Sequence, residues 1–248
     1  MDGHRSQYVG SGILVRSCTY RTTGTGSIES ASFLPHRTDM RGDTRNRILV
    51  TSLLLFNEHG EPNTTTNDIA DELDISPGNL HYHFRRKGQL VDALLDEFQA
   101  DARRVLAPPQ VEQVTIDDFW MFLHLLLECT ASYRFLYRDL ESLAESYPSV
   151  GRALGHFAKG LAAMFELYLR GLSANGALGM SEDDALIAAR NLAVIALFSD
   201  RFDTLTGKSG SADDSALRIA GSVLNALKPF AAASESTYIN DLAAHYDA

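Results

Sequence analysis

The chain has 248 residues, 45% of them hydrophobic, and a formal net charge of −10. This composition is sufficient for a full hydrophobic core and argues against a chain that is disordered throughout. The acidic total argues against a protein that coats nucleic acid without regard to sequence, because phosphate binding requires lysine and arginine.

Cysteine usage and hydropathy point to the cytoplasm. Cys18 and Cys129 are far apart and lack metal-type spacing, so a disulfide framework is not expected. The longest near-continuous apolar run, 48–56, is too short to span a bilayer. The apolar patch 12–15 is too short for the core of a signal peptide. We therefore expect a cytoplasmic protein with no membrane contact.

Residues 1–39 are rich in glycine, serine, threonine and arginine and show no sustained periodicity. This composition predicts a flexible tail. Met40 stands directly before a helical pattern. We therefore hypothesise that translation begins at Met40 and that the native protein lacks the tail.

From Met40 to residue 105 the sequence predicts three or four helices. Apolar residues recur at helical spacing over 48–56, and Gly60 follows as a stop signal. Thr65 or Thr66 is placed to cap a short second helix.

A third helix follows after a tight turn. Ser76 is its expected cap, and Pro77 occupies the first helical position, where a missing N–H costs nothing. Two short helices joined by about three residues form a helix-turn-helix. In this arrangement Ala70 permits close approach of the two helices, while Leu80 and Phe84 anchor the third helix.

The third helix should leave a short polar face exposed. Flat hydrogen-bonding side chains on such a face can enter the major groove of DNA and meet base edges or nearby phosphates. Lys87 begins the next helix, where its charge and the helix N-terminal amides can meet one phosphate together. The exposed face comprises Pro77, Gly78, Asn79, His81, Tyr82 and His83.

The charge of this segment has to be reconciled with DNA binding. Residues 40–105 hold eight basic and eleven acidic residues, a net charge of −3. Six of the eight basic residues form two clusters, Arg41 to Arg47 and Arg85 to Lys87, whereas the acids lie mainly in the second and fourth helices. A specific regulator needs a local positive face rather than a positive total. We expect weak non-specific DNA binding.

The rest of the chain is almost entirely helical in pattern. We expect an all-α protein with a DNA-binding domain at 40–105, a helical regulatory and dimerisation domain at 112–230 and a C-terminal tail at 231–248. Pro148 opens a long helix that ends at the Asn175-Gly176 turn, and Ser181 caps the next one.

The aromatic residues of the second half have two interpretations. They form an ordinary helical core, or some of them line a ligand cavity between helices. His124, Glu128, Arg134 and Arg138 lie near this apolar stretch and either orient a ligand's polar head or are simply exposed. The candidate pocket residues are Trp120, His124, Phe135, Phe165, Tyr168 and Phe198.

Other chemistry finds little support in the sequence. His81 and His83 are two positions apart, so they point to different sides of a helix and make a poor metal chelate. Gly207-Lys208-Ser209 mimics the end of a phosphate-binding loop but lacks the upstream glycine and a preceding strand. We expect no catalytic site, metal or cofactor. A helical enzyme and a protein-binding adaptor are the alternatives to a DNA-binding protein.

An ordered set of motifs spans residues 44–95 and resembles the TetR family of transcriptional regulators. It runs through Phe56-Asn-Glu-His-Gly60, Thr-Thr before the second helix, Ile69-Ala70, Ser-Pro-Gly-Asn-Leu, Tyr82-His83-Phe84 and Lys87. The resemblance implies a regulator, by default a repressor, that binds a partly palindromic operator as a homodimer and responds to a small ligand.

Individual roles follow from the same resemblance. It implies phosphate contacts for Thr66 and Ser76 and places Gly78 and Asn79 at the base edges. Tyr82, His83 and Lys87 would contact the DNA backbone, and His81 either a base or a phosphate. Two departures are His81, where the family usually has tyrosine, and Asp74, where glycine is common. Aspartate tolerates the left-handed conformation better than most residues, so the turn should survive.

Two further expectations concern the second half. In the TetR family the final helices form a four-helix dimer interface, which here corresponds to residues 183–205 and 214–228; the alternative is packing within one chain. The segments 118–125 and 133–140 resemble regulators associated with polyhydroxyalkanoate storage. This narrower resemblance suggests an acyl-type metabolite as effector.

Overall fold

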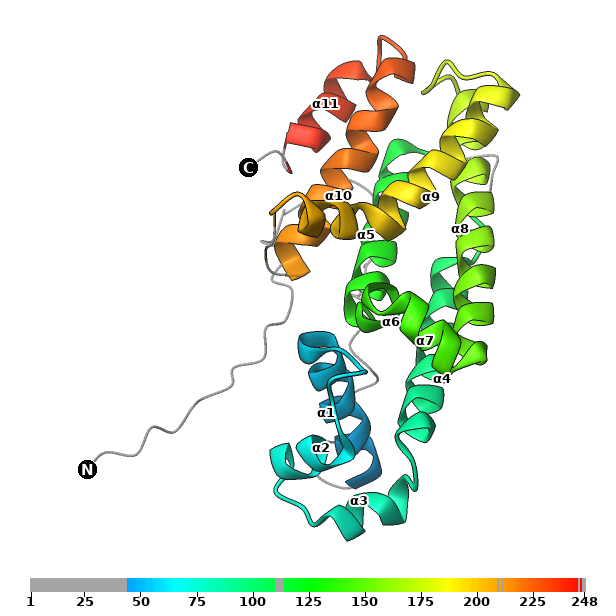
Figure 1. Ribbon diagram of the computed structural model, residues 1–248. Coiled ribbons are helices and arrows are strands. Elements are labelled where there is room, and N and C mark those ends of the chain that lie inside the picture. Colours follow the sequence, from blue (N-terminus) through cyan, green and yellow to red (C-terminus); the bar gives the residue numbers. More distant parts are fainter. Residues whose placement is uncertain (1–43, 110–113, 209, 211, 245, 247–248) are drawn as a thin grey trace, which may run out of the picture. The chain divides into compact units, whose positions relative to one another are not determined.

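Helices form nearly all the regular structure of the described residues (Figure 1). The computed structural model describes residues 44–109, 114–208, 210, 212–244 and 246. The predicted tail 1–39 and the proposed start at Met40 lie outside them. The only β-pairing in the described part is one isolated bridge between Leu178 and Ala231. The all-α prediction is confirmed.

The helices are α1 (Thr44–His59), α2 (Thr66–Glu72), α3 (Pro77–His83), α4 (Lys87–Val105), α5 (Ile116–Ser132), α6 (Phe135–Arg138), α7 (Leu140–Ser146), α8 (Pro148–Ala174), α9 (Glu182–Leu205), α10 (Ala212–Leu227) and α11 (Ser236–Ala244), with a short 3-10 helix at Lys228–Phe230.

The helix boundaries follow local signals in the sequence. Thr65, rather than Thr66, caps α2: its hydroxyl accepts the Asp68 N–H at 3.2 Å, and the Asp68 carboxylate accepts the Thr65 N–H at 2.7 Å. Ser181 caps α9 in the same reciprocal way, and Ser76 caps α3 by accepting the Asn79 N–H, both as predicted. Each cap satisfies an amide that the helix itself leaves unpaired.

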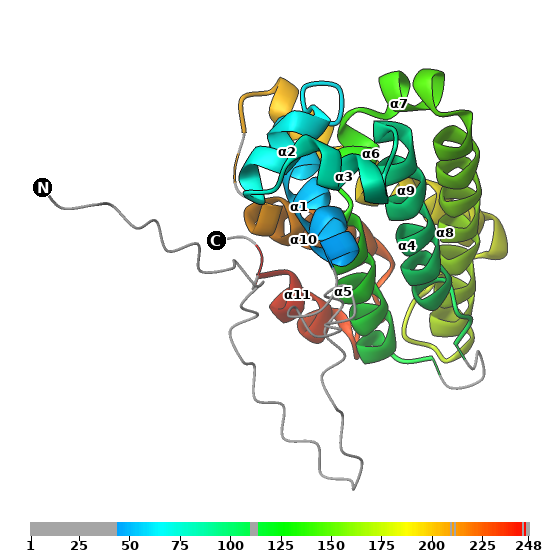
Figure 2. The same ribbon diagram turned by 90° about the horizontal axis from the view of Figure 1, so that it is seen from below.

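The helices after α3 share one continuous core. α4 lies between α5 and α8 (Figure 2), α8 packs along α9, and α10 contacts α5, α9 and α11. All described residues belong to one compact unit. The expected domain limits near 105–112 therefore stay a prediction. No helix of the described residues is long and apolar enough to cross a membrane.

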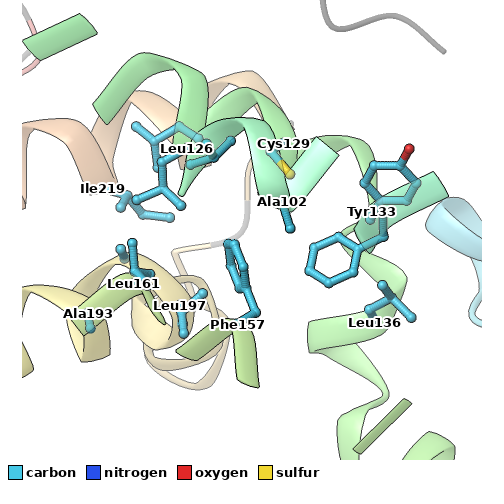
Figure 3. Close-up of a cluster of buried hydrophobic side chains, with 14 of the residues drawn as sticks. Ala102, Leu126, Cys129, Tyr133, Leu136, Phe157, Leu161, Ala193, Leu197 and Ile219 are labelled. Atoms are coloured by element: carbon cyan, nitrogen blue, oxygen red, sulfur yellow. The ribbon is translucent and has the colours of Figure 1, made fainter. Parts of the chain in front are cut away.

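Figure 3 shows a cluster of buried side chains of this core, contributed by α4, α5, α6, α8, α9 and α10 and including Cys129. Ala102 of α4, Leu126 of α5, Phe157 of α8 and Leu197 of α9 contribute to it. Cys129 is 1% exposed. Burial raises the pKa of its thiol to about 12, and the nearby Asp101 and Glu128 charges add to the shift.

We expect Cys129 to be chemically silent in the folded protein. Thiolate is the reactive form, and a pKa of about 12 instead of 9.0 lowers its amount roughly 1,000-fold at pH 8. In a Cys18→Ser variant, Ellman's reagent should therefore label Cys129 slowly in buffer and rapidly in 6 M guanidinium, roughly the concentration that unfolds most domains. Labelling in buffer at a rate within tenfold of the unfolded rate would contradict this burial.

Candidate functional site

The helix-turn-helix predicted from the sequence is formed by α2, the turn 73–76 and α3. Asp74 adopts a left-handed conformation with φ 51°, as its place in the turn requires. The Ile75 N–H donates to the Ala70 carbonyl at 3.0 Å and closes the turn. Ala70, Leu80 and Phe84 are buried, so the predicted packing of the two helices is confirmed.

The outer face of α3 is almost fully accessible. Gly78, Asn79 and His81 are exposed, and Tyr82 keeps 84% of its surface exposed. The His83 ring is half-buried and lies edge-on to the Tyr82 ring, with 5.2 Å between centroids. A large aromatic side chain held almost wholly in solvent has little structural benefit, because burial of such a ring stabilises a fold by roughly 1.5–3 kcal/mol.

The two remaining candidates flank this face at helix starts. Thr66 is the first residue of α2 and is half-buried, while Ser76 is exposed and caps α3. The Ser76 hydroxyl oxygen accepts the Asn79 N–H at 3.2 Å, which leaves its O–H free to donate elsewhere. The structure therefore gathers seven of the eight predicted DNA-contacting residues on α3 and the adjoining helix starts. Lys87 is the eighth.

Basic residues lie after the end of α3 and on the first turn of α1. Arg85 and Arg86 follow α3 directly and are exposed, and Arg47 is exposed on α1. The Arg45 guanidinium lies 4.9 Å from the centre of the Phe84 ring, which ties α1 to the end of α3 by a cation–π contact. Of the two basic clusters predicted from the sequence, Arg85 and Arg86 adjoin α3 and Arg45 reaches the end of the same helix.

Lys87 differs from the expectation that its charge is free to meet a phosphate. Its Nζ lies 3.0 Å from Glu61 Oε1 and donates to the backbone carbonyls of Glu61 at 2.9 Å and Thr64 at 3.1 Å. A lysine has three N–H donors, and these three acceptors occupy them. The backbone amides at the start of α4 have no side-chain cap. Phosphate contact at this position stays a prediction and is best assigned to those amides.

Glu61 is the centre of a junction that the sequence analysis did not predict. Its side chain is 5% exposed, and Oε1 also accepts the Tyr147 hydroxyl at 2.8 Å. The Asp139 carboxylate accepts the Glu61 backbone N–H at 3.2 Å. The loop before the helix-turn-helix is therefore bound to α4, to the α6–α7 boundary and to the start of α8. The raised pKa of Tyr147, caused by burial and then by the Glu61 carboxylate, fits this contact.

A second junction holds the C-terminal end of α1. Arg138 donates to the backbone carbonyls of Phe56 at 3.0 Å, Asn57 at 3.1 Å and Glu58 at 3.3 Å. Arg134 Nε donates to the Asn57 carbonyl at 3.0 Å. The last carbonyls of a helix have no partner within it and carry partial negative charge. The two arginines of the α6 region, which the sequence identified only as polar groups near an apolar stretch, thus cap α1.

A cavity of about 280 Å³ lies against this second junction, with walls from α1, α5, α6, α9 and α10. Its apolar walls include Leu127, Leu197 and Ile219, and its charged walls include Arg134, Arg138 and Arg201. Glu58 and Asp200 also line it.

None of the six candidate pocket residues lines this cavity. Phe135 packs against Phe56 with ring centres 5.5 Å apart, and Phe165 and Tyr168 pack against Phe122. These three are buried, as in the alternative interpretation of an ordinary core. Aromatic periodicity marks burial in general, and a filled core and a cavity wall give the same pattern.

The other three candidates lie elsewhere. Trp120 donates its indole N–H to the Tyr246 hydroxyl at 2.9 Å, and His124 Nε2 lies 2.9 Å from the same oxygen. Burial lowers the pKa of His124. Phe198 is 40% exposed on α9. No group of three or more metal-ligating side chains occurs among the residues that the structure describes.

The two segments expected at a dimer interface, 183–205 and 214–228, bury many of their apolar residues within this chain. Ala189, Leu192, Ala193, Ala196 and Ala220 pack in the core, so for them the alternative of packing within one chain holds. A different set on the same helices is exposed: Leu186, Ile187, Val194, Phe198, Phe202 and Leu205 of α9, with Leu217 of α10.

Comparison with known proteins decides the family. A family model described as "Bacterial regulatory proteins, tetR family" matches residues 48–94, and one described as "Bacterial transcriptional repressor" matches residues 97–239. The chain belongs to the TetR family. The first match covers the helix-turn-helix, and the second covers more than half of the chain, so the family assignment does not depend on the DNA-reading motif alone.

Solved structures agree with this assignment. A TetR-family transcriptional regulator from Marinobacter aquaeolei VT8 has a TM-score of 0.73 and 29% identity, over 83% of this chain and 99% of that one. KstR2 of Mycobacterium tuberculosis, described as a ketosteroid transcriptional regulator, has a TM-score of 0.54 and 20% identity, over 77% of this chain and 96% of that one. The latter similarity shows the fold alone.

Curated relatives match less than half of this chain. The probable transcriptional regulator YttP of Bacillus subtilis is 32% identical over 59 residues, which are 24% of this chain and 28% of YttP. The repressor KstR2 of Rhodococcus jostii is 28% identical over 106 residues, 41% of this chain and 52% of KstR2. The alignments therefore span about a quarter to a half of these relatives.

The Glu61 junction predicts a stability effect separate from DNA binding. Lys87→Met leaves the buried Glu61 carboxylate without its cation, so the free energy of unfolding should fall by about 1–3 kcal/mol. Arg86→Gln, the exposed neighbour, is the control and should change it by less than about 0.5 kcal/mol. Urea denaturation followed by circular dichroism measures both. Equal stability of the two variants would show that the junction contributes nothing.

Proposed function

We propose that the chain is a homodimeric TetR-family repressor that binds a partly palindromic operator and releases it when a small ligand binds among α5–α10. The observation that carries the proposal is the exposed face of α3, with Tyr82 84% exposed beside accessible Gly78 and Asn79. In a member of this family, such a face on the second helix of a helix-turn-helix is suited to enter the major groove.

Each predicted contact takes a role that its position supports. Gly78 and Asn79 face the base edges, because they lie in the first turn of α3. Thr66, Ser76 and the start of α4 bind phosphates, because backbone amides and hydroxyls gather at helix starts. His81, Tyr82 and His83 complete the contact to bases or backbone. Arg47, Arg85 and Arg86 supply the salt-dependent part of the affinity.

The homodimer is assigned to the exposed apolar face of α9 and α10. Ile187, Val194, Phe198, Phe202 and Leu205 recur at intervals of three, four or seven residues, which places them on one side of α9. We expect a second copy of the chain to cover this apolar stripe of α9, because the final helices pair in this family. A two-fold axis brings the stripes of the two copies into contact. Two recognition helices in successive major grooves then require a partly palindromic site.

The effector is proposed to be an acyl-type metabolite. The resemblance of segments 118–125 and 133–140 to regulators associated with polyhydroxyalkanoate storage supports this class. The second of these segments contains the two arginines that cap α1 and line the cavity. A ligand of this class would therefore act close to the connection between the sensing helices and the helix-turn-helix.

The test of the function is an electrophoretic shift on DNA from upstream of the protein's own gene, titrated with salt. Tight, sequence-specific and salt-sensitive binding is expected. If this DNA does not shift at low salt, selection from random genomic fragments replaces it. Failure of both would reject DNA binding and favour the protein-binding adaptor.

A substitution at Gly78 separates DNA reading from folding. A Cβ added at Gly78 would meet only Ser76 Oγ, at 3.9 Å, so the folded chain has room for a larger side chain. Gly78→Val should lower operator affinity by about tenfold or more, because the side chain would occupy space that bases need. Ala107→Val, an exposed change after α4, is the control. If the Gly78→Val variant binds the operator with unchanged affinity, α3 does not lie in the major groove.

The dimer prediction is tested by a charge on the apolar stripe. Val194→Asp should yield a monomer at micromolar concentration in light scattering, since an unpaired carboxylate in an apolar interface is costly. Met121→Asp, which alters an exposed apolar residue of α5 outside the stripe, should remain a dimer. A Val194→Asp variant that stays dimeric would place the interface elsewhere.

A further inference from the structure

The cavity beside α1 combines apolar walls with guanidinium groups that have unused hydrogen-bond donors. Leu127 and Ala131 of α5 and Leu197 of α9 contribute apolar surface. Arg134 uses only its Nε, toward Asn57, and Arg201 uses only Nη1, toward the carbonyl of Arg138. Neither arginine has a carboxylate within ion-pair distance among the residues that the structure describes.

The acidic residues at the cavity do not neutralise these arginines. Asp200 accepts a hydrogen bond from Ser215, and Glu58 is exposed at the end of α1. Asp139 lies 3.5 Å from Arg138 and pairs with that arginine alone. A guanidinium binds carboxylates through two parallel N–H donors, which makes it the usual receptor for this group. The cavity thus suits an anionic head with an apolar body.

The volume limits the size of the ligand. Ligand pockets in proteins measure roughly 300–1,000 Å³, and this cavity, at about 280 Å³, lies just below the lower limit of that range. A short or medium-length chain with one carboxylate fits these dimensions, whereas a nucleotide-sized carrier does not.

The same arginines hold α1 in place. Arg138 contacts three of its C-terminal carbonyls and Arg134 one of them. A carboxylate carries a full negative charge and a helix C-terminus about half a charge. A carboxylate in the cavity therefore competes with α1 for the two guanidinium groups, and at Arg138 it also competes with the Asp139 carboxylate.

We propose that this cavity binds a small amphipathic carboxylate whose head group draws Arg134 and Arg138 away from the end of α1, with Arg201 as a further contact. The bound carboxylate removes the C-terminal cap of the helix that supports the helix-turn-helix. The regulatory half of this proposal rests on the proposed function, while the binding half does not.

Isothermal titration calorimetry tests the binding half without DNA. The probes are butyrate, octanoate and dodecanoate, each compared with the primary alcohol of the same length. At least one carboxylate should bind about tenfold more tightly than its alcohol, because a charge-assisted hydrogen bond is lost in the alcohol. If no carboxylate binds more tightly than its alcohol, the proposed ligand class is wrong.

Variants locate the binding site. Arg201→Gln should lower the affinity for the tightest-binding carboxylate by about tenfold, since this arginine lines the cavity without capping α1. Arg152→Gln removes an exposed arginine of α8 that does not line the cavity, and its affinity should equal that of the unmodified protein. Equal affinities of the two variants would place the carboxylate outside the cavity.

Hydrogen exchange measured by mass spectrometry tests the regulatory half. The tightest carboxylate should raise amide exchange in the peptide 53–64, and Arg138→Gln should raise it without ligand, because each removes the cap of α1. Slower or unchanged exchange on ligand binding would contradict the proposed competition between the ligand and α1 for the two arginines. If the protein does not shift operator DNA, but carboxylate binding and hydrogen exchange are as expected, the proposed function is rejected and the ligand site is retained.

Discussion

The orientation of the helix-turn-helix depends on how the end of α1 and the loop after it are held. That segment has two kinds of polar group that cannot be left unpaired: the last carbonyls of α1 and the nearly buried carboxylate of Glu61. Arg134 and Arg138 satisfy the carbonyls, and Lys87 and Tyr147 satisfy the carboxylate. All four partners come from α4 or from residues beyond it.

In the proposed regulation, the contacts that stabilise the end of α1 are also the contacts that the ligand changes. Packing of apolar side chains resists displacement in every direction, but hydrogen bonds to a helix end are directional and can be exchanged for bonds to another acceptor. A cavity wall built from the capping arginines therefore gives a ligand access to the helix end without unpacking the core. Coupling of this kind is reciprocal, so DNA that fixes α1 would lower the affinity for the ligand by the same factor by which the ligand lowers the affinity for DNA.

The two surfaces assigned to partners differ in character. The α3 face is small, polar and accessible, with glycine and flat side chains that approach base edges, and arginines lie beside it. The α9 stripe is apolar and includes Leu205 at 85% exposure. Such an exposed apolar stripe in an acidic chain has a large free energy to gain from burial, which is the usual driving force of homodimer formation.

The sequence by itself determined the helical class, most helix boundaries, the helix-turn-helix and the family, because these depend on short-range signals. The Thr65 and Ser76 caps, the left-handed Asp74 and the buried Ala70 each act within a few residues of the chain. Tertiary structure alone decided which aromatic side chains fill the core, where the cavity lies, and that Lys87 is paired with Glu61. These outcomes depend on contacts such as Tyr147 with Glu61, 86 residues apart, whose geometry no local periodicity encodes.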